Sequence, residues 1–204
     1  MKNKIIAVIG AGGKTTLIHR LAEEYRRKGA SVLVSTTTHM LVEPDTDLSC
    51  DSFAIMEKIK KTGYCMAGAV CPENSAKMQS LPEQMLHDLM KQVDYALIEA
   101  DGAKHYALKY PSEQEPVIPE GTTDVILVLG SWDLGKPCKD VVFRFEHMTS
   151  ALGISGDMKA DKQMLQWIWQ AYEEKLKNMD YQGHFHVLLS EKTDQGLMFH
   201  TLEE

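Results

Sequence analysis

The residues best suited to chemistry lie between Val8 and Leu21, in the stretch VIGAGGKTTLIHRL. The standard phosphate-binding loop reads G-x-x-x-x-G-K-[ST], and Gly13, Lys14 and Thr15 match its last three positions. The first glycine of that pattern would fall at position 8, which is Val8. The loop is therefore shorter than the standard one, and the first question is whether it still binds a phosphate.

The shortened loop keeps each group that phosphate binding needs. Glycines let backbone N–H groups approach the phosphate, a helix N-terminus favours anions, a lysine reaches the β- and γ-phosphates, and a hydroxyl binds Mg²⁺. The loop also lies between a predicted strand and a predicted helix, as the motif requires. The alternative is a glycine-rich turn without a ligand. We expect Mg²⁺ with ATP or GTP, bound by Gly10, Ala11, Gly12, Gly13, Lys14, Thr15 and Thr16.

Two acidic residues end a second informative stretch, YALIEADGA. An apolar strand that ends in carboxylates is the expected partner of a phosphate loop, because the carboxylates bind Mg²⁺ directly or through water. Glu99 and Asp101 lie on the same side of this strand if it stays extended. We expect Asp101 to be the first metal ligand and Glu99 the second, and the alternative is a polar strand end without a metal.

Three threonines and a histidine follow another predicted strand, in the stretch STTTHM. They would lie at the same sheet edge as the loop, where a threonine hydroxyl binds Mg²⁺ or contacts the γ-phosphate. The alternative is an ordinary strand end, since threonine favours strands. The role of His39 stays open. The predicted metal ligands are Thr15, Thr37, Glu99 and Asp101.

The elements that position these residues alternate along the chain. Short apolar runs predict strands over 4–10, 31–38, 64–70, 94–103, 123–130 and 184–191, the last of which is the final strand. Amphipathic periodicity predicts helices over 14–29, 53–61, 81–92 and 160–178. This order predicts an α/β fold with a mostly parallel sheet and helices on both faces, like that of P-loop NTPases. Residues 102–122 have no clear period and follow a strand end, where open α/β sheets bind ligands.

Length and composition exclude several classes of protein. The 204 residues suit a single nucleotide-binding domain over 1–204, and a net charge of −7 argues against nucleic acid as a partner. No apolar run reaches the ~18 residues of a membrane span, and the apolar run near the N-terminus is too short for a signal peptide. The four cysteines form no CxxC pair, so we expect no zinc site. We expect reduced thiols in a cytoplasmic protein.

Three phrases together resemble the YqeC family, which comprises accessory proteins of selenium-dependent molybdenum hydroxylases. They are VIGAGGKTTLIHRLAEEYRRKGASVLVSTTTHM, DYALIEADGAKHYALKYPSEQEPVIP and GKPCKDVVFRFEHM. The resemblance is strongest over residues 5–147, where both the order and the spacing of the phrases match. It implies a P-loop protein that binds a nucleotide and helps to mature a selenium- and molybdenum-containing enzyme or its cofactor.

The resemblance also implies roles for particular residues. It assigns residues 10–16 to the nucleotide, and residues 36–39 and 99–104 to the reaction centre. Lys109, Glu115 and Arg144 are matching positions without an assigned role. Arg144 would stabilise charge on a transferring phosphate, and the alternative is a solvated surface arginine. The predicted catalytic residues are Lys14, Asp101 and Arg144.

Two further functions compete with nucleotide-dependent maturation. The loop is similar to that of Mur ligases, and residues 104–115 are polar enough to hold an acceptor, so a small-molecule kinase or ligase is one alternative. A nucleotide-gated binding module without turnover is the other. The base stays open, because related GTPases read guanine with N-K-x-D, whereas SEKTD places Glu191 in the asparagine position.

Overall fold

A computed structural model describes residues 3–202 of the chain. By its internal packing the chain divides into two compact units, each built from separate segments. The first unit comprises Met1–Val8, Thr15–Gly102 and Val117–Asp124, and the second comprises Ile9–Lys14, Ala103–Pro116 and Val125–Glu204. The single domain expected over 1–204 stays a prediction.

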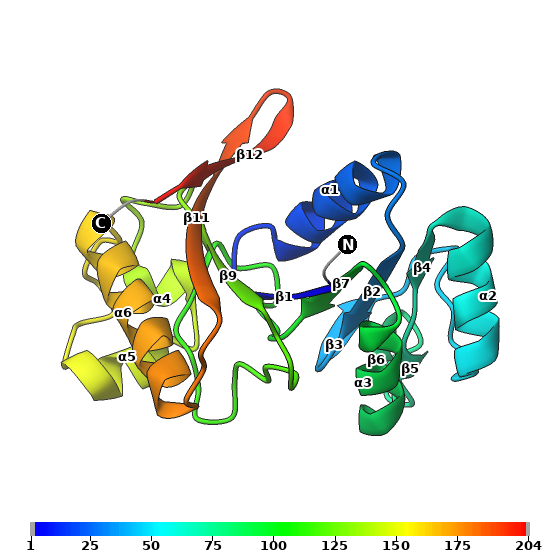
Figure 1. The fold of residues 1–204 in the computed structure, drawn as a ribbon. Helices are drawn as coiled ribbons and strands as arrows, with labels where there is room; N and C mark the ends of the chain where they lie inside the picture. Colours follow the sequence, from blue (N-terminus) through cyan, green and yellow to red (C-terminus); the bar gives the residue numbers. More distant parts are fainter. Residues whose placement is uncertain (1–2, 203–204) are drawn as a thin grey trace. The chain divides into compact units, whose positions relative to one another are not determined.

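Four parallel strands form the centre of the first unit (Figure 1). They are hydrogen-bonded in the order β1-β7-β2-β4. Their residues are apolar and almost continuously buried, as expected of strands covered on both faces. The bounds are β1 (Lys4–Gly10), β2 (Val32–Thr36), β4 (Tyr64–Met66) and β7 (Tyr95–Glu99).

Helices cover both faces of this sheet. On one face lies α1 (Lys14–Arg27), where the ring of Tyr25 stacks on that of Tyr95 in β7 with centroids 3.7 Å apart. The opposite face is covered by α2 (Ser52–Thr62) and α3 (Glu83–Lys91). These two helices share one hydrophobic cluster with the sheet, which includes Ile5, Leu33, Ile55, Ile59, Cys65, Leu86, Leu89, Ala96 and Ile98.

A small three-stranded antiparallel sheet completes the first unit. It comprises β3 (His39–Leu41), β6 (Lys77–Gln79) and β5 (Ala69–Val70), in the order β3-β6-β5. The single strand expected over 64–70 is wrong in part. The chain instead leaves the parallel sheet after β4, and Ala69 and Val70 pair with β6.

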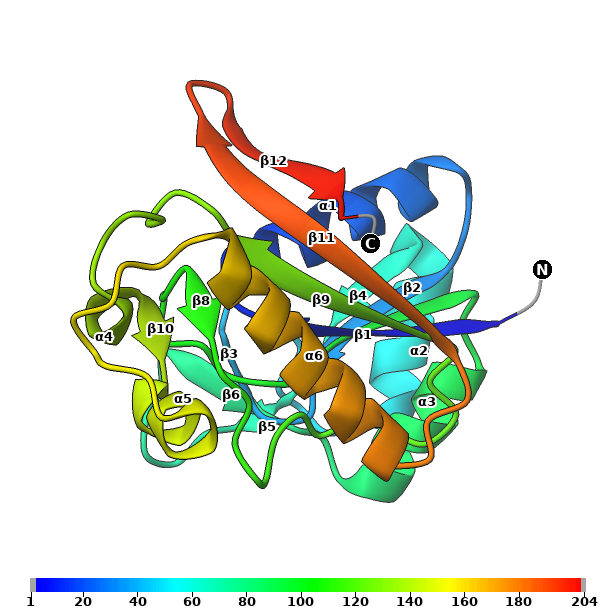
Figure 2. The ribbon, with the colours of Figure 1, turned by 90° about the vertical axis from the view of Figure 1, so that its left-hand side faces the viewer.

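The second unit is built around three strands and a long helix. These are β9 (Asp124–Gly130), β11 (His184–Thr193), β12 (Gly196–Thr201) and α6 (Lys162–Asn178), and the strands have the order β12-β11-β9. Figure 2 shows α6 running along β11 and β9. The smaller elements are β8 (Leu108–Lys109), β10 (Val142–Phe143), α4 (Cys138–Val141) and α5 (Phe145–Leu152).

The structure confirms the predicted α/β class, the mostly parallel sheet and helices on both faces. One correction concerns the C-terminal part, where the predicted last strand over 184–191 is followed by β12. The two strands form an antiparallel hairpin, and the apolar run in β12 covers only three residues, Leu197, Met198 and Phe199. Within residues 3–202, none of the helices is both long enough and apolar enough to cross a bilayer.

Candidate functional site

The glycines of the loop after β1 are required by backbone conformation and by close packing. Gly10, Gly12 and Gly13 have φ angles of +88°, +86° and +108°, which side chains strongly disfavour. A Cβ atom on Gly12 would also come within 2.5 Å of the backbone nitrogen of Gly130 at the end of β9. A Cβ atom on Gly13 would collide with the side chain of Leu197 in β12. The loop therefore cannot accept side chains at these positions without moving.

Three hydrogen bonds hold the loop in place within the second unit. The backbone N–H of Ala11 donates to the carbonyl oxygen of Val128 at 2.9 Å. The buried hydroxyl of Ser190 in β11 donates to the carbonyl oxygen of Gly12. The ammonium group of Lys14 donates to the carbonyl oxygen of Gly10 at 2.8 Å, although Lys14 is only 5% exposed. The predicted lysine thus lies folded against its own loop.

The helix that follows the loop begins where the motif predicts. Helix α1 starts at Lys14, so Thr15 and Thr16 lie in its first turn, where backbone N–H groups lack partners within the helix. No acidic residue occupies this turn, which leaves the positive end of the helix dipole available to an anion. The hydroxyl of Thr15 donates to Glu99 Oε2 at 2.9 Å, which joins two of the predicted metal ligands.

Strand register brings the predicted motifs of the first unit to one sheet edge. Glu99, the last residue of β7, pairs with Val8 of β1 on one side and with Thr36 of β2 on the other. The hydroxyl of Thr36 donates to the backbone oxygen of Glu99 at 2.8 Å. The expected convergence of the loop strand, the acidic strand end and the threonine segment is therefore confirmed at the level of the strands.

The remaining two predicted metal ligands have different surroundings. Asp101 is fully buried, but β7 ends at Glu99 and Asp101 lies in a bend, so strand alternation does not relate the two carboxylates. The hydroxyl of Thr37 donates to the carbonyl oxygen of Val117 at 2.7 Å. Whether these side chains bind a metal stays a prediction.

Arg144 belongs to a cluster of charges in the second unit. Its guanidinium is 3.0 Å from Glu115 Oε2, and the ammonium of the fully buried Lys109 is 2.7 Å from the same oxygen. Lys104, Lys109 and Arg144 all lie within 6 Å of the ring centroid of Phe143. The side chain of Arg144 is thus in contact with Glu115 and Phe143, and its role stays a prediction.

Backbone strain accompanies this cluster. Lys104, His105 and Arg144 have φ angles of +45°, +66° and +63°, which are uncommon for residues other than glycine. Such strain tends to gather at functional sites, where the surrounding structure maintains it. Glu115, whose role the sequence left open, pairs with both Lys109 and Arg144.

Residues 190–194, SEKTD, which the sequence analysis compared with the N-K-x-D motif, lie in β11 and the turn after it. Glu191 and Lys192 lie within β11, and Asp194 lies in the tight turn of the β11–β12 hairpin. The ammonium of Lys192 lies 4.5 Å from the centroid of the Trp132 ring. The residue of this segment that contacts the loop is Ser190, which sequence reasoning missed because its pattern shows only a serine in an apolar strand.

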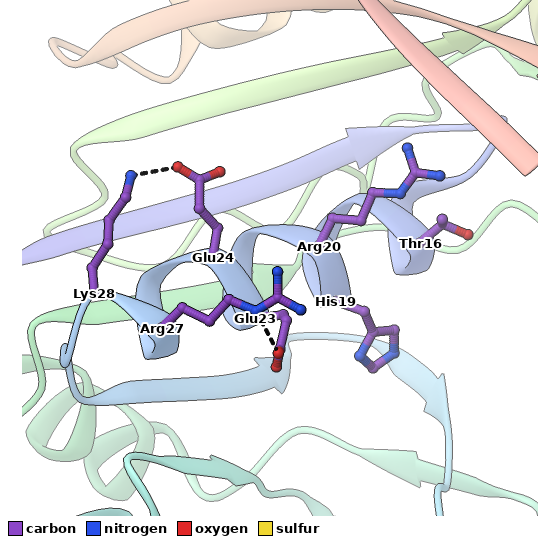
Figure 3. A pocket seen from close by; sticks show the side chains of 7 residues that line it. All are labelled: Thr16, His19, Arg20, Glu23, Glu24, Arg27 and Lys28. Atoms are coloured by element: carbon purple, nitrogen blue, oxygen red, sulfur yellow. Dashed lines mark hydrogen bonds and ion pairs between the residues drawn. The ribbon is translucent and has the colours of Figure 1, made fainter.

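A surface hollow of about 810 Å³ runs along α1 and is shown in Figure 3. The residues that line it have polar or charged ends, and Glu23 and Glu24 are paired with Arg27 and Lys28 one turn further on. Thr16 lies at its end. It is lined by Thr16, His19, Arg20, Glu23, Glu24, Arg27 and Lys28.

Comparison with known proteins gives one family and one curated relative. The family described as YqeC protein matches residues 6–146. A protein of Escherichia coli (strain K12), named "Uncharacterized protein YqeC", is 34% identical over 161 residues. The match covers 75% of this chain and 62% of that relative, so the chain spans about three fifths of the relative's length. No solved structure matches the chain.

Proposed function

Because the chain belongs to the YqeC family, we propose that it is a cytoplasmic, nucleotide-dependent accessory protein with a fold like that of P-loop NTPases. Residues 10–16 bind ATP or GTP with Mg²⁺, and the nucleotide drives maturation of a selenium-dependent molybdenum hydroxylase or of its cofactor. The observation that carries the proposal is the 2.9 Å hydrogen bond between Thr15 Oγ1 and Glu99 Oε2. It joins a hydroxyl in the first turn of the helix to a carboxylate at the strand end.

The donor set at this edge fits a magnesium ion. Mg²⁺ prefers oxygen ligands and is usually bound by one or two carboxylates together with phosphate oxygens. Thr15 and Glu99 supply a hydroxyl and a carboxylate in contact, and Asp101 supplies a second carboxylate two residues later. When bound, the ion would polarise phosphate oxygens as a Lewis acid.

The loop itself would hold the phosphates. Lys14 donates to the carbonyl oxygen of Gly10, and a phosphate oxygen is a stronger partner for an ammonium group than a neutral carbonyl. We expect the Lys14 side chain to leave Gly10 when a nucleotide binds. The positive φ angles of Gly10, Gly12 and Gly13 orient the loop backbone, and its N–H groups would complete the cradle.

A competition titration with ATP, GTP and CTP in the presence of Mg²⁺ tests the proposal. Wild-type protein should bind one nucleotide tightly, and Lys14→Ala should weaken its binding at least about 100-fold, since a charge-assisted contact to phosphate is lost. Lys91→Ala, at an exposed lysine at the end of α3, is the matched control and should bind like the wild type.

The outcomes separate the competing functions. If no nucleotide binds at millimolar concentration, or if Lys14→Ala binds as tightly as the wild type, the proposal is wrong. Tight binding with turnover at background level would identify a nucleotide-gated module without catalysis. Turnover that Lys14→Ala abolishes would support a nucleotide-hydrolysing accessory protein.

A small-molecule kinase or ligase is the second candidate, and the Lys104, Lys109 and Arg144 cluster favours it. Three cationic side chains around one ring, with a single carboxylate among them, suit an anionic acceptor. Mass spectrometry of a small-molecule extract incubated with the protein and Mg²⁺–ATP tests this candidate. A phosphorylated or adenylated compound that forms with the wild type and not with Lys14→Ala would support it.

A further inference from the structure

Three side chains of metal-binding types converge in the first unit, and the spacing of the cysteines gave no sign of them. A nitrogen of His39, the sulfur of Cys71 and a carboxylate oxygen of Glu73 all lie within 4.8 Å of one another. We propose that these residues bind a divalent metal ion of borderline softness, for which Zn²⁺ is the best match. This site goes beyond the proposed function and needs no nucleotide.

The small antiparallel sheet brings two of the ligands together. His39 in β3 lies opposite Gln79 in β6, and Gln79 lies opposite Ala69 in β5. Residues directly opposite one another in antiparallel strands point to the same face of the sheet. Cys71 directly follows β5, which ends at Val70, and its sulfur lies within 4.8 Å of a nitrogen of His39. Residues far apart in the sequence thus meet across three strands.

A tight turn adds the third ligand. The backbone N–H of Asn74 donates to the carbonyl oxygen of Cys71 at 3.2 Å, which closes a four-residue turn. Pro72 occupies the second position of this turn, where its fixed φ angle is favourable. The turn brings the Glu73 carboxylate back to Cys71, whose thiol donates to Glu73 Oε2 at 3.5 Å. Two ligands are therefore positioned by one short and rigid segment.

The donor set selects the class of ion. One nitrogen, one sulfur and one oxygen suit Zn²⁺ and similar ions, whereas Mg²⁺ prefers oxygen ligands alone. Zinc–ligand bonds of about 2.0–2.3 Å at tetrahedral angles place the ligand atoms about 3.4–3.8 Å apart. The three ligand atoms, which lie within 4.8 Å of one another, would reach these distances by movements of about 1 Å. Cys71 is only 3% exposed and stays fixed, whereas His39 and Glu73 are exposed side chains that can adjust.

Three protein ligands leave a fourth position open, which is the arrangement of catalytic rather than structural zinc sites. His39 also follows directly on the threonine segment at the end of β2. Thr36, three residues earlier, donates to the backbone oxygen of Glu99, which belongs to the proposed magnesium site. His39 and the proposed magnesium ligand Glu99 are therefore linked through one short stretch of chain within the first unit.

Cobalt(II) binding to the metal-free full chain tests the inference, since Co²⁺ replaces Zn²⁺ and reports its ligands. We expect a thiolate-to-cobalt charge-transfer band in the near ultraviolet that Zn²⁺ abolishes. Equilibrium dialysis with Zn²⁺ should give one ion per chain. His39→Ala and Glu73→Gln change exposed side chains, and each should weaken Zn²⁺ binding by at least about tenfold. Cys71→Ser should also remove the charge-transfer band.

Matched controls change the same residue types elsewhere. Cys50→Ser, His147→Ala and Glu57→Gln should keep the band and the zinc affinity of the wild type. The inference is overturned if the folded wild type shows no thiolate band with excess Co²⁺, or if His39→Ala and Glu73→Gln bind Zn²⁺ as tightly as the wild type. Loss of the band in Cys50→Ser would also overturn it. Because no nucleotide is present, these results are independent of the proposed nucleotide binding.

Discussion

At the scale of single residues, the contact between Thr15 and Glu99 is the feature most directly tied to chemistry. Glu99 is only 7% exposed, and its carboxylate accepts the hydroxyl proton of Thr15 at 2.9 Å. A buried carboxylate needs hydrogen bonds or a cation to offset its lost hydration. A metal ion bound here would therefore interact with a carboxylate, that of Glu99, whose position is already fixed by the hydrogen bond from Thr15.

We predict that Glu99→Gln separates metal binding from folding. The amide oxygen of glutamine can still accept the Thr15 hydroxyl, so stability should change little, whereas the negative charge that attracts Mg²⁺ is lost. The Mg²⁺ concentration needed for half-maximal nucleotide binding should rise at least about tenfold. Titration of Mg²⁺ at fixed nucleotide measures this shift. Glu57→Gln, on the exposed side of α2, is the control, and an unchanged requirement in Glu99→Gln would contradict the prediction.

At the scale of elements, the phosphate loop depends on strands that the motif does not contain. Gly12 packs on the end of β9, Gly13 lies next to Leu197 of β12, and Ser190 of β11 binds the carbonyl oxygen of Gly12. The same β11 carries Lys192, which lies over Trp132. The hairpin of β11 and β12 thus serves as a support for the loop within the second unit.

Ser190→Ala should loosen this support. It leaves the carbonyl oxygens of Gly12 and Leu129 without the Ser190 hydroxyl, so the free energy of unfolding should fall by about 1–3 kcal/mol. Nucleotide affinity should fall as well, because the loop backbone is less fixed. Denaturant unfolding and nucleotide titration measure the two effects. Ser112→Ala is the matched control, since the buried Ser112 hydroxyl makes no hydrogen bond within residues 3–202. Equal effects of the two substitutions would refute the role of Ser190.

At the opposite end of the parallel sheet, Asp94 and Ser31 connect the starts of two strands by hydrogen bonds. The Asp94 carboxylate, just before β7, accepts the backbone N–H and the hydroxyl of Ser31, just before β2, at 2.9 and 2.8 Å. The backbone hydrogen bond from Ser31, and then its side-chain bond, lower the pKa of Asp94. A lowered folded-state pKa stabilises the protein above the unfolded value of about 3.9, and this stabilisation is lost as the pH falls through the folded pKa.

Asp94→Asn should therefore destabilise the protein at pH 7 and much less at low pH. The effect at pH 7 should stay below about 1 kcal/mol, because the carboxylate is largely solvated and screened. Below the folded pKa the wild type carries no charge at this site either, so the two proteins should become similar. Urea unfolding at a series of pH values from 7 downward, until the difference between the two proteins stops changing, measures this effect. Asp45→Asn, at an exposed aspartate, is the control and should leave the stability at pH 7 unchanged.

At the scale of the whole molecule, the chain forms two compact units, and each unit contains several separate segments of the chain. The segment Ile9–Lys14 belongs to the second unit, whereas the strand before it and the helix after it belong to the first. The cysteines are distributed over both units, with Cys50, Cys65 and Cys71 in the first and Cys138 in the second. Three of the four, Cys65, Cys71 and Cys138, are buried.

The four thiols should differ strongly in reactivity toward an alkylating reagent. Burial raises the pKa of Cys65 to about 11, so only about a thousandth of it is thiolate at pH 8, and burial also raises the pKa of Cys138. The half-buried Cys50 should react first, and Cys65 and Cys138 only in guanidinium. Mass spectrometry of alkylated peptides measures this order. Zn²⁺ should slow the reaction of Cys71 alone, and modification of native Cys65 ahead of Cys50 would contradict the prediction.

The sequence by itself determined the features that depend only on short segments of the chain. The glycines and the lysine of the loop, the acids after an apolar run and the alternation of strands and helices are local patterns, because each depends on residues within one or two turns of chain. From them follow the α/β class, the start of α1 at Lys14 and the convergence of Glu99 with Thr36. The parallel order of strands made that convergence predictable.

Only the tertiary structure decided which distant residues meet. Three contacts join segments that are distant in the sequence and that carry no local pattern predicting the contact. They are those of Ser190 with the loop, Arg144 with Glu115, and His39 with Cys71. The contact of Ser190 depends on strand order and register, which are set by the packing of the whole sheet rather than by local propensity. The zinc-type site is the clearest case, because no cysteine pair marks it and three paired strands create it.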